Sequence, residues 1–348
     1  MESITIDLDL PPRERWVEPG RAIAPMVRDL SESAQEVAEE ILPSFFRPLI
    51  GSGSSLPAHQ LCRTISADMT EEASGLSEAT GISVTQLVLA NCTYDFTQLC
   101  SAAVYQDTSG RPVMLRNMDW DLPAGIGRYT IMVNYVRSGV PVYSTLGFAG
   151  FLGVVTAFSP EWALAMNQAP SDHFRALHPV KKASVLTATP TTYAMRQVCD
   201  QATSFGDLNR RLMKVRTMTP FLALTCGAKS GEGTRIESPG RGKTTAIDIG
   251  DENPLVLTNH YLDGKNVALN GPREWVDDDG NSWPLDSSGR RFCKMKELAL
   301  RFGKKESLPS LTSLRSNPIF WDATVHTAVM RPASREFRHA NHLHGCDS

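Results

Sequence analysis

The stretch from residue 98 to residue 120 constrains the fold of this chain more than any other. Two runs of small, β-branched and apolar residues, 100–106 and 112–115, flank the segment Asp107-Thr-Ser-Gly110. That segment has the composition of a tight turn, so the stretch predicts a β-hairpin. A hairpin folds its far end back onto its start, so residues near 116–119 are expected beside residue 100.

Cys100 begins the first run and is a candidate nucleophile. The thiolate is the nucleophilic form of cysteine, and an unperturbed thiol is mostly protonated at neutral pH. A guanidinium from Arg116, with Asp119 close by, would lower the pKa of this thiol. The same pattern also fits a buried structural cysteine next to an ordinary Arg/Asp pair, because free cysteines are commonly buried. The local pattern alone leaves both interpretations open.

Composition excludes several classes of function. The chain has 348 residues, 41% hydrophobic and 21% charged, which is the balance of a soluble globular protein with one large domain or two. A net charge of -3 without a strong basic run gives no electrostatic reason to expect a nucleic-acid partner. No stretch has the length of a membrane span, and no signal peptide is visible. These features favour a cytoplasmic protein, with a lysosomal or secreted one as the alternative if a signal was trimmed.

Neither a metal nor a cofactor is expected. The seven cysteines are odd in number and form no CxxC motif, so the sequence suggests no disulfide framework and no zinc site. The loop at 51–55 lacks the lysine of a phosphate-binding loop, and the charged turn at 277–281 lacks the spacing of a calcium loop. Three histidines and a cysteine in the tail at 338–346 are expected to belong to a mobile terminus. The sequon at Asn91 falls in an expected helix, which favours chance over glycosylation.

The remaining chain mixes helical and strand patterns. The composition shifts at residue 100, from a mostly helical segment with one strand to a β-rich region. Helices are expected over 23–42, from a capping box at Ser83 and Gln86 towards Tyr94, and over 191–203, 205–214 and 290–302. Strands are expected over 4–10, 129–136, 140–146, 153–158, 162–166, 221–226, 234–237, 244–249, 255–258 and 323–330. This pattern predicts an α+β fold in which helices cover two packed sheets.

The motifs Cys100-Ser-Ala-Ala-Val104 and Gly110-Arg-Pro-Val-Met-Leu-Arg-Asn-Met-Asp-Trp120 resemble the signature of the cholylglycine-hydrolase-type N-terminal-nucleophile hydrolases, the family of acid ceramidase and N-acylethanolamine acid amidase. Further segments resemble the same family in the same order, so the likeness covers most of the chain. They are Ile4 to Trp16, Phe148 to Phe158, Gly231-Glu-Gly233 and Leu257-Thr-Asn-His-Tyr261.

The resemblance implies a four-layer αββα sandwich of two antiparallel sheets and a self-processing cysteine amidase. The precursor would cut its own Leu99–Cys100 bond, which divides it into an α-subunit-like segment, 1–99, and a β-subunit-like catalytic domain, 100–348. Cys100 would then carry both the thiol and a free α-amine as the base, whose pKa near 8 suits proton exchange with a thiol. No catalytic histidine is required.

The resemblance also implies roles for further residues. Asp119 would hold the new α-amine, and Arg116 would stabilise the thiolate and orient the substrate. The oxyanion hole is expected from the side-chain amide of Asn259 and the backbone N–H of Asn167. Asparagines that cap strand ends are the alternative interpretation for Asn167.

A late arginine of the family corresponds to Arg290 or Arg291, and we favour Arg290. Two departures from the family are visible. Gln168 stands where relatives carry a glutamate, which weakens the expectation that acid activates the cleavage. The cysteine that joins the two subunits of acid ceramidase has no clear counterpart here, so packing alone would hold the fragments together.

The expected substrate is a fatty-acyl amide of the N-acylethanolamine or ceramide type. Trp120, Phe148 and Phe151 are candidates for lining an acyl channel, although plain core is the more frequent reason for such apolar runs. Transient contact with a membrane surface stays open, since lipid amides reside in membranes. The alternatives are an acyltransferase of the same fold and an unprocessed lipid-binding homologue.

Overall fold

The structure is a computed structural model that describes residues 1–41, 62–63, 66–93, 98–120, 125–169, 188–239, 243–250, 253–264, 266–270, 274–276, 282–284 and 286–343. The expected loop at 51–55, the charged turn at 277–281 and the end of the tail from residue 344 lie outside the described residues.

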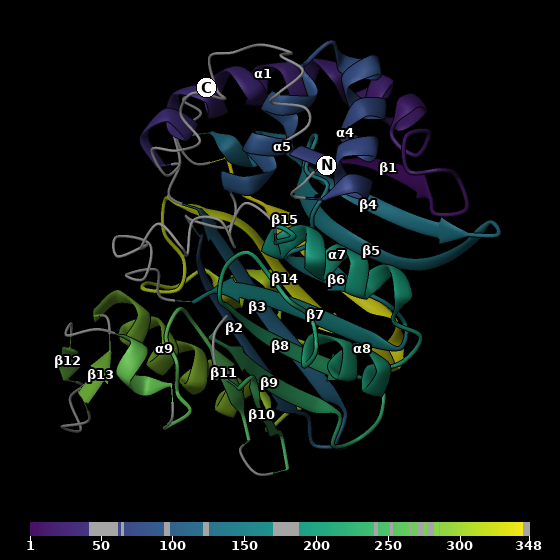
Figure 1. Cartoon of the computed structure of the whole chain (residues 1–348). Helices are drawn as coiled ribbons and strands as arrows, with labels where there is room; N and C mark the ends of the chain where they lie inside the picture. The colour runs from purple at the N-terminus through teal and green to yellow at the C-terminus, as the bar shows by residue number, and fades with distance from the viewer. Residues whose placement is uncertain are drawn as a thin grey trace.

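Two sheets form the centre of the molecule (Figure 1). The eight-stranded sheet has, in spatial order, β1 (Glu2–Asp7), β4 (Thr130–Arg137), β5 (Val140–Phe148), β6 (Thr156–Phe158), β7 (Trp162–Gln168), β8 (Phe221–Gly227), β9 (Gly233–Ser238) and β10 (Thr245–Asp248). The five-stranded sheet has β11 (Leu255–Leu257), β2 (Gln98–Gln106), β3 (Pro112–Trp120), β14 (Thr324–Arg331) and β15 (Glu336–Asn341). A separate small pair joins β12 (Glu274–Val276) to β13 (Ser282–Pro284).

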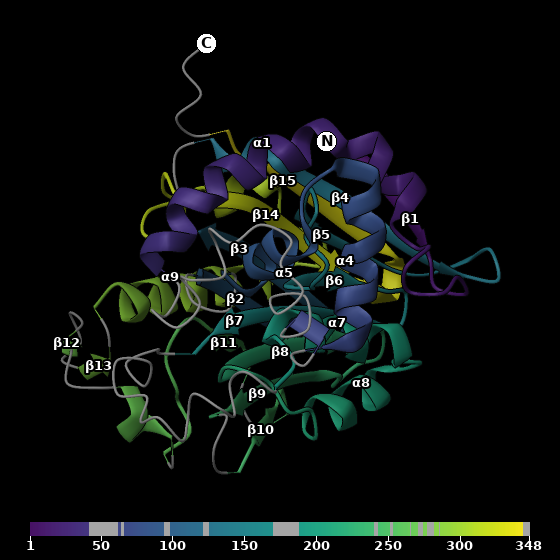
Figure 2. The ribbon, with the colours of Figure 1, turned by 45° about the horizontal axis from the view of Figure 1, so that its top comes forward.

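Helices cover both outer faces of this pair of sheets. In Figure 1, α7 and α8 lie in front of the eight-stranded sheet, and the strands of the other sheet run behind it. Figure 2 shows α1 and α4 from the top of the molecule, with α9 on the opposite side from α8. The helices are α1 (Val17–Ile41), α4 (Ala67–Thr80), α5 (Val84–Thr93), α7 (Thr191–Gln201), α8 (Phe205–Leu212) and α9 (Asp286–Phe302). Short 3-10 turns lie at Ile126–Tyr129, Val267–Asn270, Leu311–Leu314 and Pro332–Ser334. The expected four-layer sandwich is confirmed.

Alternation along β2 explains how this strand serves two cores. Ala102 and Val104 face the other sheet and belong to the cluster between the sheets, whereas Ala103 and Tyr105 pack against α9. Successive side chains of a strand point to opposite faces. Cys100, which shares the parity of Ala102, therefore faces inward between the two sheets.

The segment before residue 100 is built into the fold. Strand β1 pairs in parallel with β4 at the edge of the eight-stranded sheet, and α1, α4 and α5 pack against one another. In α1, Gly20 lies so close to Leu76 and Ala79 of α4 that a Cβ atom there would come within 2.9 Å of both side chains. The division at residues 99 and 100 remains a prediction.

Several elements differ from the sequence-based expectation. Helix α1 begins at Val17 rather than residue 23, because Pro19 falls in the first turn, where a missing N–H costs nothing. Strand β3 continues to Trp120. The expectation of a mobile tail is wrong for residues 338–342, since β15 pairs with β14 and His342 Nε2 lies 2.9 Å from Thr327 Oγ1.

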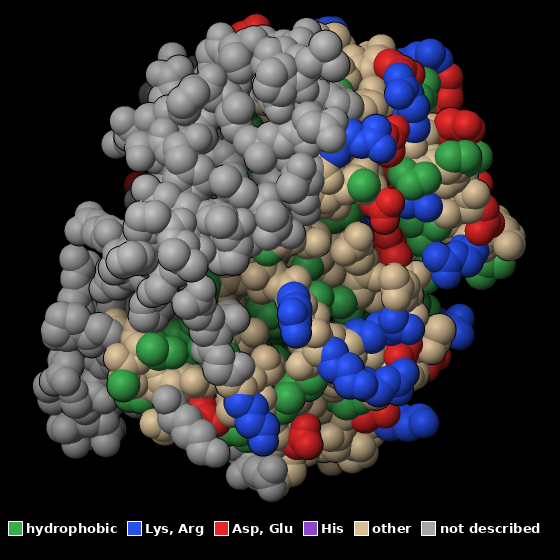
Figure 3. Space-filling model, viewed as in Figure 1, with side chains coloured by type: hydrophobic (Ala, Val, Ile, Leu, Met, Phe, Trp, Pro, Cys, Tyr) green, Lys and Arg blue, Asp and Glu red, His purple; other side chains and the backbone are tan. Residues whose placement is uncertain are grey.

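None of the described helices combines the length and apolarity of a bilayer span. Among the coloured atoms of Figure 3, acidic and basic side chains lie close to one another, and apolar side chains are scattered. Asn91 is buried, donates to Leu87 O and Gly150 O and accepts from Leu152 N, so the folded chain offers no glycosylation site there.

Candidate active site

The predicted hairpin is formed by β2 and β3, and it brings the expected residues together. In its register, Cys100 is opposite Met118, Ala102 is opposite Arg116, and Asp119 is opposite Leu99. Strand β2 runs without interruption through Leu99 and Cys100. The structure therefore describes the intact chain, with the Cys100 side chain fully buried.

A single guanidinium group holds the Cys100 sulfur. Arg116 Nη2 lies 3.1 Å from Sγ and donates to Met166 O at 2.9 Å. Its Nη1 donates to Asn167 Oδ1, and its Nε donates to Thr156 Oγ1 at 3.2 Å. Burial raises the pKa of the Cys100 thiol, whereas the charge of Arg116 lowers it. Arg116 thus favours the thiolate in an apolar surrounding that opposes it.

Asn259 and Arg291 hold the backbone of Cys100. Asn259 Oδ1 accepts the Cys100 N–H at 2.8 Å and an Arg291 N–H at 3.0 Å, while its Nδ2 donates to Gln168 O at 2.9 Å. The partners fix which end of the amide is the oxygen. Arg291 also donates to Cys100 O at 2.5 Å and to Ser101 Oγ at 3.1 Å. In the intact chain, the amide oxygen of Asn259, and not its N–H, faces the Cys100 nitrogen.

Arg291, and not the favoured Arg290, reaches Cys100. The two follow each other at the start of α9, and a helix turns about 100° per residue, so only one can face the sheet. Arg291 is 3% exposed, whereas Arg290 lies on the exposed side of the helix. The preference for Arg290 is therefore corrected on position.

Asn167 acts in the structure through its side chain, which joins the two sheets. It lies on β7 and faces the five-stranded sheet, where Nδ2 donates to Thr258 O at 2.8 Å and to Cys100 O at 3.2 Å. Its Oδ1 accepts from Arg116. The backbone role predicted for Asn167 remains untested.

Asp119 is a fully buried carboxyl near the same centre. Oδ1 accepts from Thr324 Oγ1 at 2.8 Å, and Oδ2 has no hydrogen-bond partner among the described residues. Burial raises the pKa of Asp119 to about 6, and the charges of Arg291 and Arg116 oppose this rise. An unpaired buried carboxylate oxygen is costly, which makes it a ready acceptor for a new N–H donor.

Burial outweighs the neighbouring charges, so the pKa of the Cys100 thiol in the intact chain is raised. Two buried guanidinium groups, of Arg116 and Arg291, and one buried carboxyl, of Asp119, affect the ionisation of Cys100. With Asp119 ionised, a Cys100 thiolate balances these two positive charges. In a medium of low dielectric constant, such a balance carries much more energy than it would in water.

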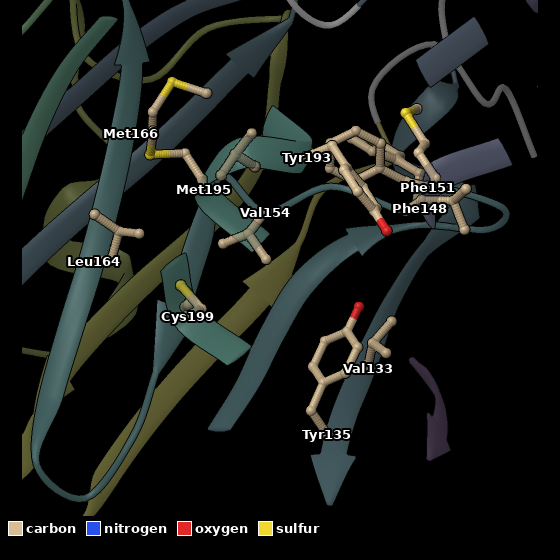
Figure 4. Packing of buried hydrophobic residues seen from close by; sticks show 14 of the residues in the cluster. Val133, Tyr135, Phe148, Phe151, Val154, Leu164, Met166, Tyr193, Met195 and Cys199 are labelled. Atoms are coloured by element: carbon tan, nitrogen blue, oxygen red, sulfur yellow. The ribbon is translucent and has the colours of Figure 1, made fainter. Parts of the chain in front are cut away.

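The three aromatic candidates lie in one apolar cluster with Cys100. Trp120, Phe148 and Phe151 are each less than 5% exposed, and the rings of Trp120 and Phe148 are 5.1 Å apart. Figure 4 shows Phe148 and Phe151 beside Tyr193 in this cluster. Their role as substrate-binding residues stays a prediction.

Sequence reasoning missed Thr156 on strand β6, whose hydroxyl oxygen accepts a hydrogen bond from Arg116 Nε. Nothing in its local pattern distinguishes it from any buried strand threonine. Among the described residues, no group of three His, Cys, Asp or Glu side chains could hold a metal ion.

Comparisons with known proteins show what this chain is similar to. The family model for the beta subunit of N-acylethanolamine-hydrolyzing acid amidase matches residues 2–56, the segment called α-subunit-like above. Acid ceramidase of Mus musculus is 25% identical over 98% of this chain and 86% of its own length. The N-acylethanolamine-hydrolyzing acid amidase of Caenorhabditis elegans is 25% identical over 94% of this chain and 88% of its own length.

The fold has a solved counterpart. The structure of the Caenorhabditis elegans N-acylethanolamine-hydrolyzing acid amidase ortholog superposes with a TM-score of 0.52 at 23% identity, covering 67% of this chain and 93% of that one. This match shows the fold, and the sequence relatives indicate an amide-hydrolysing enzyme similar to acid ceramidase and N-acylethanolamine-hydrolyzing acid amidase.

Proposed function

We propose that this chain is a self-processing cysteine amidase that first cleaves its own Leu99–Cys100 bond and then hydrolyses the amide bond of N-acylated lipids. One observation carries the proposal. The sulfur of Cys100 is held by Arg116, its N–H by Asn259 and its carbonyl by Arg291, all buried. Such a fixed setting suits a nucleophile that attacks the adjoining peptide bond.

Self-cleavage follows from ordinary thiol chemistry. Cys100 Sγ attacks the carbonyl carbon of Leu99, a C–S bond forms, the C–N bond of the peptide breaks, and the thiol proton passes to the departing nitrogen. Water then hydrolyses the thioester at Leu99. The products are the fragments 1–99 and 100–348, the second of which begins with a free α-amine on Cys100.

The same atoms then process a substrate. The α-amine takes the thiol proton, Sγ attacks the amide carbonyl of the lipid, and the amine leaves with that proton. Water, activated by the α-amine, hydrolyses the acyl thioester and releases a fatty acid. The unpaired Oδ2 of Asp119 supports its proposed role as the acceptor that holds the new amine.

The substrate class follows from the relatives and the apolar surroundings. The two relatives are named for ceramide and for N-acylethanolamine, both amides of fatty acids. Cys100 lies in the same apolar cluster as Trp120, Phe148 and Phe151, which suits a long acyl chain better than a polar one. We therefore propose long-chain N-acylethanolamines or ceramides as substrates, and the paired fragments as the active form.

Intact mass spectrometry tests the proposal. Wild type, Cys100→Ala and the matched control Cys226→Ala, a buried cysteine on β8, are compared before and after incubation at acidic pH. Wild type and Cys226→Ala should each yield two chains, the second beginning at Cys100, while Cys100→Ala stays whole. The split proteins are then given fatty-acyl ethanolamides and ceramides, with and without an added amine.

Each outcome decides something. Release of free fatty acid supports the proposed hydrolysis. Transfer of the acyl group to the added amine would instead show that the enzyme is an acyltransferase. If wild type stays whole and releases no fatty acid under any condition, the proposed mechanism is wrong.

A further inference from the structure

One buried serine ties together the two elements that hold the Cys100 backbone. Ser288 lies in the first turn of α9 and is 2% exposed. It precedes Arg291 by three residues, and residues at this spacing share one face of a helix. Whatever fixes Ser288 therefore also fixes the point from which Arg291 extends to Cys100.

The Ser288 hydroxyl contacts three consecutive residues of the loop after β11. Ser288 Oγ accepts the backbone N–H of Asn259 at 2.9 Å and donates to Thr258 Oγ1 at 3.0 Å. His260 Nδ1 lies 2.8 Å from the same oxygen and 3.1 Å from Thr258 Oγ1. Burial, with the charges of Arg291 and Arg235, lowers the pKa of His260 to about 3, so its ring is neutral at any working pH. Because the Ser288 hydroxyl proton is given to Thr258, we assign Nδ1–H of His260 as a donor to Ser288 Oγ.

We propose that Ser288 is a positioning residue for the reaction of Cys100. Ser288 acts indirectly, through Asn259 and Arg291, which are hydrogen-bonded to each other at Asn259 Oδ1. Asn259 binds the N–H of Cys100, and Arg291 binds its carbonyl oxygen. Without the hydroxyl, the buried Asn259 N–H loses this hydrogen bond, and α9 keeps its contact with the loop through Arg291 and Asn259 Oδ1. The two groups that set the direction of the Cys100 backbone stay joined to each other, but they are held less rigidly against the rest of the loop.

The expected effect is on rate. A small misplacement of a catalytic group by a change away from the chemistry can cost up to about 100-fold in rate, so we expect a loss of about 10–100-fold. The variant Ser288→Ala should lower the rate of Leu99–Cys100 cleavage and the kcat for a fatty-acyl ethanolamide by about that factor, with KM within about twofold of wild type. Ser288→Cys keeps the size of the side chain but offers only a weak hydrogen-bond acceptor, so its cleavage rate and kcat should lie between those of wild type and Ser288→Ala.

The neighbouring residue provides the matched control. Ser287 is exposed on the same turn, so Ser287→Ala makes the same chemical change without touching the loop, and it should match wild type. Melting temperatures and amide hydrogen exchange of peptides covering 98–106 and 255–262 are measured in parallel. Faster exchange in both peptides of Ser288→Ala, and not of Ser287→Ala, is expected.

The inference rests on the proposed function, but the two fail differently. If wild type neither splits nor hydrolyses amides, the proposed function falls, and exchange alone decides the role of Ser288: unchanged exchange at both peptides overturns it. If wild type is active and Ser288→Ala loses only thermal stability, with kcat of the folded protein unchanged, Ser288 is merely structural and the inference is refuted. Should Ser288→Ala not fold, Ser288→Cys is held to the same criteria.

Discussion

A buried ion pair joins the segment before residue 100 to the segment after it. Glu72 on α4 and Arg196 on α7 both have side chains with no exposed area, and two parallel hydrogen bonds of 3.0 and 3.1 Å connect them. The Glu72 carboxylate also accepts from Trp16 Nε1 at 2.7 Å and Arg15 Nη1 at 2.9 Å. Four donors thus converge on one carboxylate.

Replacing Glu72 with glutamine should strongly destabilise the fold. The change keeps the size of the side chain but removes its charge and turns an N–H₂ group toward a buried guanidinium. Removing one partner of a buried pair costs about 3–5 kcal/mol. Because Arg196 keeps its contacts with Asp200, both at 3.0 Å, we expect the lower end of this range, about 3 kcal/mol. With an unfolding entropy of about 2.1 cal/mol/K per residue over 348 residues, this corresponds to a fall of roughly 4 °C in melting temperature.

The measurement is thermal and urea unfolding in a Cys100→Ala background, so that every sample is one intact chain. Glu78→Gln is the matched control, because Glu78 lies on the same helix and pairs with Arg13 at the surface, where the two side chains are 49% and 57% exposed. Such a pair contributes at most about 1 kcal/mol. If the two variants melt within about a degree of each other, the Glu72–Arg196 pair contributes much less than about 3 kcal/mol to the free energy of unfolding, and the reasoning is refuted.

Three further predictions concern the site. Arg291→Lys should slow cleavage at least about tenfold, because one ammonium group cannot make the several hydrogen bonds of the Arg291 guanidinium at Cys100. The control Arg290→Lys should be cleaved at the wild-type rate in the same time course. Thr156→Val removes the acceptor of the Arg116 Nε proton and should slow cleavage by about tenfold; an unchanged rate would show that the other contacts of Arg116 suffice. Because folding raises the Asp119 pKa from 3.8 to about 6, ionisation opposes the fold as pH rises through this window. Asp119→Asn should therefore gain in melting temperature over wild type between about pH 4 and pH 6, and a difference that does not change with pH would contradict the shift.

The hairpin could be predicted because its signals are local. A turn sequence between two β-favouring runs fixes which residues face each other, so the sequence alone places Arg116 and Asp119 near Cys100. Strand β15 escaped prediction because it is a short edge strand of mostly polar residues, and edge strands are often polar.

The choice between the two arginines could have been made from helical periodicity. Met295, Leu298 and Ala299 form the apolar face of α9 that packs on the sheet. Arg291 precedes Met295 by four residues and Leu298 by seven, which places it on that face, whereas Arg290 is out of phase. Contacts such as Thr156 with Arg116 bridge the two sheets, and no local pattern encodes them.

The residues that bind Cys100 follow it in the sequence, whereas several of the apolar residues packed around it precede it. The described groups that bind its sulfur, N–H and carbonyl all come from residues after 100, so a cut at Leu99 would remove none of them. Leu87, Val88 and Cys92, which precede the cut, share the apolar cluster with Cys100. In the intact chain Leu99 is bonded to Cys100 within β2, and Cys100 is fully buried. In the proposed mechanism, cleavage frees the amine that would serve as base and releases Leu99 from the place of a substrate carbonyl, without disturbing the groups that orient the nucleophile.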